Sequence, residues 1–124
     1  MSKTDKAKIL LVDDNEDMCE SLTDVITMDS AYNVSHTTNP LRALEMIRTG
    51  EFSLIIIDYK MPTMNGIELL KRIKQIKADF PVLVLTAFIS DELTEQAEKN
   101  GAREVLSKFI RPDALLEHIK NAIA

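Results

Sequence analysis

The sequence predicts a doubly wound α/β fold, in which a single open sheet of five parallel strands lies between two layers of helices. Short apolar clusters alternate five times with longer segments whose apolar residues recur at helical spacing. Three of these clusters are apolar throughout, as expected for strands that helices cover on both faces. The 124 residues are enough for one domain with its own hydrophobic core.

The strand candidates are short runs at residues 9–12, 32–36, 54–57, 82–85 and 104–106. The first, third and fourth contain only Ile, Leu and Val, which places them inside the sheet. The second alternates apolar with polar residues and therefore suits an edge of the sheet. A repeated strand–helix unit with right-handed crossovers predicts the strand order 2-1-3-4-5, in a (βα)5 arrangement.

Helical spacing of apolar residues marks the segments between the strands, at residues 18–26, 41–47, 67–76, 90–99 and 115–123. A proline beside a cap-type side chain indicates the start of two of these helices, at Pro40 and Pro112. The helix at 90–99 has only Leu93 and Ala97 on its apolar face, so we expect it to be weakly packed and mobile.

Composition and charge narrow the class of function. With 45% hydrophobic and 28% charged residues, the chain is typical of one compact domain over residues 1–124, with a flexible N-terminus at about residues 1–6. The net charge of −5 argues against direct contact with nucleic acid, which needs clustered Lys and Arg. We therefore expect protein partners or small ligands.

The single cysteine, Cys19, has no second thiol with which to form a disulfide or a zinc site, which favours a reducing compartment. Its position in the first predicted helix favours a buried structural role. The first apolar run ends at Asp13 and is too short for a signal peptide or a membrane span. We therefore expect a soluble cytoplasmic protein that does not bind a membrane.

Polar residues follow four of the predicted strands, where the strands end: Asp13, Asp14, Asp58, Thr86 and Lys108. Each has an ordinary explanation when taken alone, such as a helix N-cap for Asp14 or a solvated charge for Lys108. Together they would meet at the carboxyl edge of the sheet, because the first and third strands are neighbours in the predicted order. Ligands of doubly wound folds bind at that edge, so we expect a site there.

Three converging carboxylates need a cation, because two unit charges at about 4 Å repel by roughly 4 kcal/mol at an effective dielectric constant of 20. Oxygen ligands and a phosphate-binding role favour Mg²⁺, or the similar Mn²⁺. Lys108 would add a fixed positive charge and Thr86 a hydrogen-bond donor, which are the groups that a phosphoryl group needs. One carboxylate can act as the nucleophile in aspartyl-phosphate chemistry.

The chain resembles the receiver domains of two-component response regulators, the CheY-like superfamily with a flavodoxin-like fold, over essentially its whole length. The resemblance rests on four segments in order, namely KILLVDD at 8–14, DYKMPTMNG at 58–66, LTA at 85–87 and NGA at 100–102 followed by Lys108. Any one of these segments is a weak signal, but the ordered set is a strong one.

The resemblance implies that Asp58 is the phosphoacceptor and attacks a phosphohistidine on a sensor histidine kinase or a histidine phosphotransfer protein. The receiver then catalyses its own phosphorylation and dephosphorylation, without turning over an external substrate. Asp13, Asp14, Asp58 and the backbone carbonyl of Lys60 are implied as the metal ligands.

The resemblance also implies a switch. Lys108 would pair with the phosphoryl group, while the hydroxyl of Thr86 would move toward a phosphoryl oxygen and draw the following loop inward. Phosphorylation would thereby shift the population of two conformations and regulate a partner or an attached output domain. The implied output surface consists of the fourth helix, the fifth strand and the fifth helix.

Two positions depart from the family pattern. Val105 is at the switch position where many members have Tyr or Phe, so no ring can swing inward with Thr86. Phe109 follows Lys108 where the family usually has a proline joined by a cis bond. Since a cis bond before a residue other than proline costs about 2.5 to 4 kcal/mol, we expect a trans bond here. These changes could shift Lys108 and alter the choice of partner.

Three alternatives remain open from the sequence. A receiver-type fold can act as an interaction module without phosphorylation, although the intact acidic set argues against it. A small Mg²⁺-dependent phosphohydrolase of the haloacid-dehalogenase type needs Asp-x-Asp followed by small residues, which segment 13–17 lacks. A flavodoxin-like carrier of FMN needs a phosphate-binding loop after the first strand, where Asp13 and Asp14 would repel a phosphate.

Overall fold

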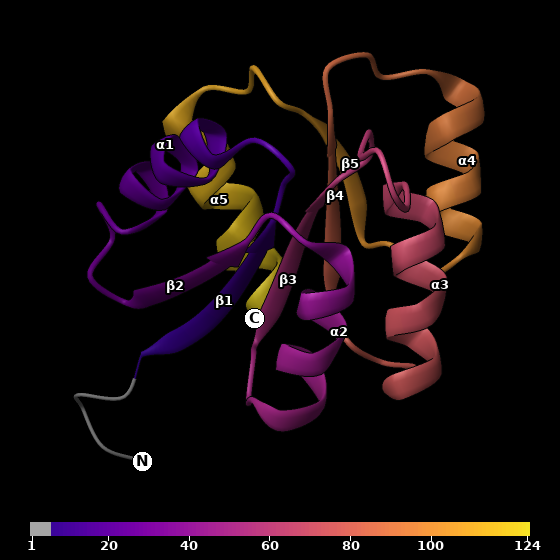
Figure 1. The fold of residues 1–124 in the computed structure, drawn as a ribbon. Helices are drawn as coiled ribbons and strands as arrows, with labels where there is room; N and C mark the ends of the chain where they lie inside the picture. Colours follow the sequence, from indigo (N-terminus) through magenta and orange to yellow (C-terminus); the bar gives the residue numbers. More distant parts are fainter. Residues whose placement is uncertain (1–5) are drawn as a thin grey trace.

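A computed structural model describes residues 6–124, in which strands and helices alternate along the chain (Figure 1). The expected flexible N-terminus, about residues 1–6, lies outside the described residues except for residue 6. The elements are β1 (Ala7–Val12), α1 (Glu16–Ile26), β2 (Tyr32–Thr37), α2 (Pro40–Thr49), β3 (Leu54–Asp58), α3 (Gly66–Ile76), β4 (Val82–Thr86), α4 (Asp91–Lys99), β5 (Glu104–Ser107) and α5 (Pro112–Ile123).

The strands form one parallel sheet in the order β2-β1-β3-β4-β5, which confirms the predicted topology. The polar alternation of the second strand did identify an edge, because β2 pairs with β1 alone. Strands β1, β3 and β4 lie inside the sheet, and their apolar runs are almost fully buried. Four of the residues expected at the site, Asp13, Asp14, Asp58 and Thr86, therefore lie on or just after buried inner strands.

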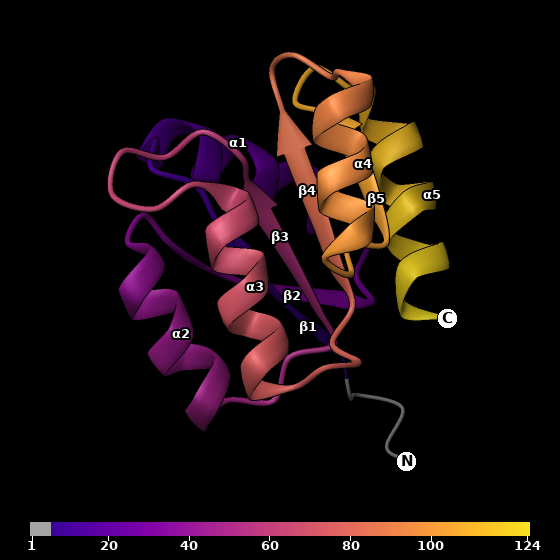
Figure 2. The ribbon, with the colours of Figure 1, turned by 90° about the vertical axis from the view of Figure 1, so that its right-hand side faces the viewer.

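Helices cover both faces of the sheet. Helices α1 and α5 lie against one face, and α2, α3 and α4 lie against the other (Figures 1 and 2). Each face has its own apolar core: Leu70 and Ile73 of α3 pack on one side, and Ile26 of α1 and Ile119 of α5 on the other. Strand residues point alternately into the two cores, which explains why the inner strands are apolar throughout.

Short polar side chains begin four of the helices. The side-chain oxygens of Asn15, Asn39, Asn65 and Ser90 accept hydrogen bonds from backbone N–H groups in the first turns of α1, α2, α3 and α4. Asn15, and not Asp14, is the N-cap of α1, so Asp14 is not used as a cap. Pro40 and Pro112 begin α2 and α5 as predicted.

Helix α4 has the thin apolar face that the sequence predicts. Its only buried residues are Leu93 and Ala97, and the rest of its surface is mostly acidic.

No helix within residues 6–124 is long and apolar enough to span a membrane.

Candidate functional site

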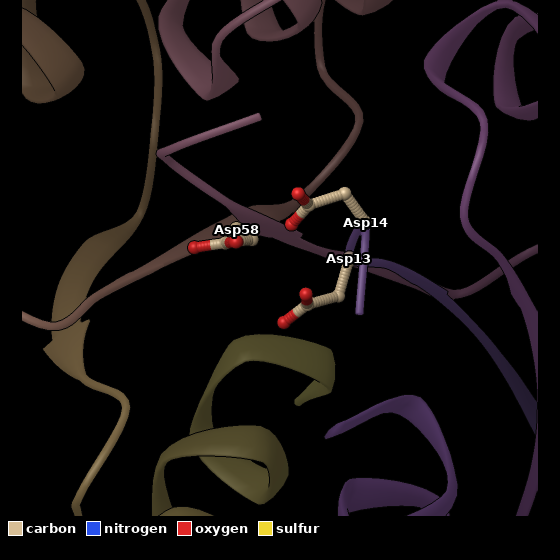
Figure 3. A group of neighbouring side chains, drawn as sticks. All are labelled: Asp13, Asp14 and Asp58. Atoms are coloured by element: carbon tan, nitrogen blue, oxygen red, sulfur yellow. The ribbon is translucent and has the colours of Figure 1, made fainter. Parts of the chain in front are cut away.

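Three aspartates converge at the carboxyl edge of the sheet (Figure 3). Asp13 and Asp14 follow β1, and Asp58 is the last residue of β3. Strands β1 and β3 pair with Val12 beside Ile57. The next residues, Asp13 and Asp58, therefore lie side by side. One carboxylate oxygen from each of the three lies within 4.8 Å of the others.

The three carboxylates differ in their exposure to solvent. Asp13 is 1% exposed and Asp58 is 4% exposed, whereas Asp14 is open to solvent. Asp13 Oδ1 accepts a hydrogen bond from the backbone N–H of Asn15 at 3.0 Å, while Oδ2 is buried and accepts no hydrogen bond in the described residues. A buried carboxylate oxygen without a hydrogen bond needs a positive charge nearby.

Lys108 supplies a positive charge from the end of β5, which β4 separates from β3. Its Nζ lies 3.1 Å from Asp13 Oδ2 and 3.2 Å from Asp58 Oδ2. The first contact is an ion pair without the directed geometry of a hydrogen bond. The backbone N–H of Lys108 donates to the carbonyl of Thr86 at 2.9 Å, which fixes where the side chain leaves the end of β5.

Burial and mutual charge shift the proton affinities of this cluster. Burial, and then the negative charge of Asp13, raise the pKa of Asp58 against the opposing effect of Lys108. For Lys108, burial lowers the pKa, but the contacts with Asp13 and Asp58 outweigh it and raise the pKa overall. Lys108 therefore stays charged, and the cluster keeps an excess of negative charge.

The carboxylate set suits a hard divalent cation. It offers three carboxylates, one of them exposed and two buried, and the hydrogen-bond-free oxygen of Asp13 contacts the same ammonium group as Asp58. This is the donor set that Mg²⁺ prefers when it also keeps waters and substrate oxygens. The cluster therefore has the composition of an acidic metal-binding pocket.

An open pocket of about 400 Å³ lies over Asp58. Asp14, Lys60, Thr86 and Lys108 line it together with Asp58. Most of the sequence-predicted site residues are thus gathered around one hollow, and Asp13 does not line it but contacts Lys108, which does. The pocket is open to solvent and lined by Lys108 and Thr86, so a phosphoryl group carried by another molecule can reach Asp58 there.

The hydroxyl of Thr86 is held by the loop that follows β4. Its Oγ1 accepts a hydrogen bond from the backbone N–H of Phe88 at 3.2 Å and donates to the Phe88 carbonyl at 3.3 Å. Thr86 itself is 5% exposed, whereas the Phe88 ring is 85% exposed. Any movement of the Thr86 hydroxyl toward Asp58 must therefore break its contacts with the Phe88 backbone.

Sequence reasoning missed how the loop after Asp58 is held. The N–H of Tyr59 donates to the carbonyl of Leu85 at 2.8 Å, and the N–H of Gly66 donates to the carbonyl of Tyr59 at 2.6 Å. A Cβ at Gly66 would lie 2.8 Å from the Asp58 carbonyl oxygen. The only signal in the sequence was Gly66 itself, at the start of a helix where glycine is otherwise unfavourable.

The structure places the two departures from the family pattern at the edge of the core and at the surface. Val105 is partly buried and packs against the apolar core on the side of α4. No peptide bond within residues 6–124 is cis, which confirms the expected trans bond between Lys108 and Phe109. Lys108 still reaches both buried carboxylates, and the Phe109 ring is 76% exposed beside the site.

Comparison with known proteins agrees with this geometry. The family model for the response regulator receiver domain matches residues 9–120. The chain is 36% identical over 120 residues to the transcriptional regulatory protein ZraR of Klebsiella oxytoca, covering 97% of this chain and 27% of that protein. It is 31% identical over 116 residues to sporulation initiation phosphotransferase F of Bacillus subtilis, covering 94% of this chain and 90% of that protein.

Solved structures give the same result. The chain superposes with a TM-score of 0.87 on the chemotaxis protein CheY4 of Vibrio cholerae, at 28% identity, over 94% of this chain and 98% of that one. It superposes with a TM-score of 0.88 on a CheY-like receiver domain protein of Methanospirillum hungatei, at 27% identity, over 95% and 94% of the two chains.

The coverage differs between relatives, because the chain spans only about a quarter of the ZraR proteins but most of the phosphotransferase. The part that they share is the domain described above. The chain belongs to the response regulator receiver domain family of two-component signalling, whose members are phosphorylation-activated switches.

Proposed function

We propose that this receiver accepts a phosphoryl group on the Asp58 carboxylate, from a phosphohistidine of a sensor histidine kinase or a histidine phosphotransfer protein. The observation that carries the proposal is the position of Lys108 Nζ, 3.1 and 3.2 Å from Asp13 and Asp58, at the floor of an open pocket. Only a carboxylate at the base of such a pocket combines access for a donor with a fixed counter-charge.

In the proposed reaction, an Asp58 carboxylate oxygen attacks the phosphorus and forms a P–O bond. The P–N bond to the donor imidazole breaks, and the imidazole nitrogen leaves with the bonding electrons and takes up a proton from solvent. Lys108 stabilises the charge that spreads over the phosphoryl oxygens. Hydrolysis by water in the same pocket would later return the free Asp58 carboxylate.

A divalent cation held by Asp13, Asp14, Asp58 and the carbonyl of Lys60 would neutralise the carboxylates and the phosphoryl oxygens, as Mg²⁺ or Mn²⁺ does in phosphoryl transfer. Asp14 is the exposed member of the set, so it can exchange water for the cation without unfolding the edge. The hydrogen bond from Asn15 to Asp13 Oδ1 orients the buried carboxylate toward the same point.

The switch would run from Asp58 through Thr86. A phosphoryl group brings about two negative charges and several acceptor oxygens, which offer the Thr86 hydroxyl a stronger partner than the Phe88 carbonyl. When the hydroxyl leaves, the loop after β4 loses both contacts that hold it. The thinly packed α4 then shifts, with smaller repacking around Val105 in place of an aromatic side chain.

We propose the surface of α4, β5 and α5 as the output face, acting on a partner protein or an attached output domain. Receiver domains in general interact with kinases, phosphotransfer proteins and output domains. We take residues 1–124 as one receiver domain that makes no direct contact with nucleic acid and acts in the cytoplasm, in line with the single reduced Cys19.

The test is the intact mass of the protein after incubation with acetyl phosphate, with and without Mg²⁺. We expect a gain of one phosphoryl group that depends on Mg²⁺ and disappears in Asp58→Asn. Asp14→Asn should need more Mg²⁺ for the same labelling, whereas Asp17→Asn, an exposed aspartate in the first turn of α1, should label like the native chain. No gain of mass in a folded, Mg²⁺-binding protein would favour an interaction module that works without phosphorylation.

A further inference from the structure

A groove runs between α2 and α3 at the amino edge of the sheet, the edge opposite the aspartate cluster. The two helices lie side by side on one face of the sheet (Figure 2). Two adjacent hollows of about 440 and 420 Å³ lie along them and share Arg48 and Ile76 as lining residues, so they form one continuous feature. We call it the α2–α3 groove, lined by the C-terminal halves of these helices, the segment between α2 and β3, and the loop before β4.

The floor of the α2–α3 groove is apolar. Leu44 and Ile47 of α2 and Phe80 before β4 are each 4 to 5% exposed, and Ile76 of α3 is partly exposed. These side chains belong to or pack against the core on this face of the sheet, so the floor is held rigidly. The partly exposed apolar side chains of the lining, Phe52 and Ile76, are the ones that a partner's aliphatic side chains can contact.

The rim of the groove is basic, although the whole chain carries a net charge of −5. Arg48, Arg72 and Lys77 line it, against a single acidic residue, Glu51. Arg48 makes no ion pair within residues 6–124, and Arg72 has only a solvent-exposed contact with Glu68 at 3.7 Å. Lys77 Nζ lies over the Phe80 ring, 5.4 Å from its centroid. Because exposed ion pairs are weak, Arg48 and Arg72 are free to meet an anionic partner.

We propose that the α2–α3 groove docks an acidic amphipathic helix of a partner protein, with aliphatic side chains on the floor and carboxylates at Arg48, Arg72 and Lys77. The combination fits this class of ligand because the floor needs apolar groups at helical spacing and the rim needs negative charge. A nucleic acid would leave the apolar floor unfilled.

A second copy of this chain does not fit the groove. Its acidic helices are α4, with Asp91, Glu92, Glu95 and Glu98, and α1, with Glu16, Asp17, Glu20 and Asp24. The buried apolar residues of both helices pack against their own sheet, so neither helix has one of them to place on the floor. The occupant is therefore a different protein, docked at the edge away from the phosphorylation pocket.

The test uses the whole ¹⁵N-labelled chain and synthetic helical peptides of about 14 residues. One peptide has Leu at helical spacing with Glu elsewhere, a second has Lys in place of Glu, and a third has Ser in place of Leu. We expect the Leu/Glu peptide alone to shift backbone amide signals in the C-terminal halves of α2 and α3. The affinity should fall with rising salt concentration.

Charge reversal identifies the surface. The double variant Arg48→Glu/Arg72→Glu should weaken binding on the order of tenfold. Arg42→Glu is the matched control, because Arg42 lies on α2, pairs with Glu45 and does not line the groove, so its affinity should equal that of the native chain. Unchanged phosphorylation by acetyl phosphate would show that each variant is folded.

Four results would overturn the proposal. The first is that the Lys peptide binds as tightly as the Leu/Glu peptide, and the second is that amide shifts are confined to other surfaces. The third is that Arg42→Glu lowers the affinity as much as Arg48→Glu/Arg72→Glu does. The fourth is that no peptide binds. Self-association that the double variant abolishes, without peptide binding, would assign the groove to a second copy instead.

Discussion

Lys108 holds together two buried carboxylates that would otherwise repel each other. We expect Lys108→Met to lower the free energy of unfolding by on the order of 3 kcal/mol without divalent metal, because it leaves Asp13 and Asp58 buried without a counter-charge. Mg²⁺ should then stabilise the variant more than it stabilises the native chain. Urea unfolding with and without Mg²⁺ measures both effects.

The matched control is Lys120→Met, which removes an exposed ammonium from the last turn of α5. Its free energy of unfolding should stay within about 0.5 kcal/mol of the native value. If Lys108→Met were as stable as this control, the ion pairs at the site would contribute nothing to folding.

Cys19 gives the stability of the protein a dependence on alkaline pH. The thiol is fully buried, and burial, followed by the charges of Asp13 and Glu16, raises its pKa from 9.0 to about 11. A raised thiol pKa means that this contribution to stability is fully present below pH 9.0, the value for the unfolded chain. It is lost as pH rises through about 11, because the thiolate forms more readily in the unfolded chain.

We therefore expect the native chain to lose stability relative to Cys19→Ala, by on the order of 2 kcal/mol, as pH rises from 9.0 to about 11. Guanidinium unfolding of both proteins at several pH values gives the difference. Other groups that titrate in this range cancel, because both proteins contain them. A constant difference across the range would contradict the prediction.

Individual site residues were predictable, while their contacts were not. Asp58, Thr86 and Lys108 could be named because the residue after a buried parallel strand must lie at one edge of the sheet. That the Thr86 hydroxyl binds the Phe88 backbone depends on a rotamer and on the path of a loop, neither of which has a periodic signal. The same holds for the hydrogen-bond-free oxygen of Asp13.

The junction of β3 with α3 depends on Gly66. We expect Gly66→Ala to lower the free energy of unfolding by about 2 kcal/mol, because the new Cβ would lie 2.8 Å from both the Asp58 carbonyl oxygen and Tyr59 Cα. It should also slow phosphorylation, since relief of the overlap moves the backbone of Asp58. Urea unfolding and the rate of acetyl phosphate labelling test the two effects.

Gly101→Ala offers a control with a different cause of instability. Gly101 has φ of 98°, which favours glycine, and its neighbours are atoms of the Lys74 side chain, away from Asp58. This variant should lose stability but keep the native rate of labelling. Equal effects of the two variants on labelling would mean that Gly66 acts on the site only through global stability.

Helix and strand identities followed from periodicity, but several boundaries did not. The first helix begins at Glu16, two residues before its first apolar residue on the predicted face, because Asn15 caps the chain there. Polar first turns carry no apolar signal, so a prediction from apolar spacing starts such helices late. The thin apolar face of α4 was predicted correctly, because two inward residues in nine are visible in the sequence.

Across the molecule, the strand order was predictable because crossover handedness leaves few arrangements of a repeated strand–helix unit. The distribution of charge over the surface was not, because it depends on which residues of different helices become neighbours. Acidic α4 and the basic rim of the α2–α3 groove are separate regions of a chain with a net charge of −5. The sequence alone predicts the net charge but not how the charges divide between these two regions.

The bond between Thr86 and the Phe88 backbone makes the loop after β4 a natural position for an optical probe. The sequence contains no tryptophan, so Phe88→Trp would create a single indole fluorophore on an exposed side chain. If phosphorylation draws the loop inward, its emission should move to shorter wavelength on addition of acetyl phosphate and Mg²⁺, and should not move when Asp58→Asn is also present. An unchanged spectrum in a chain that mass measurement shows to be phosphorylated would separate the chemistry from the loop movement. A moving spectrum would allow the lifetime of the signal to be followed in real time, without a partner and without a radioactive label.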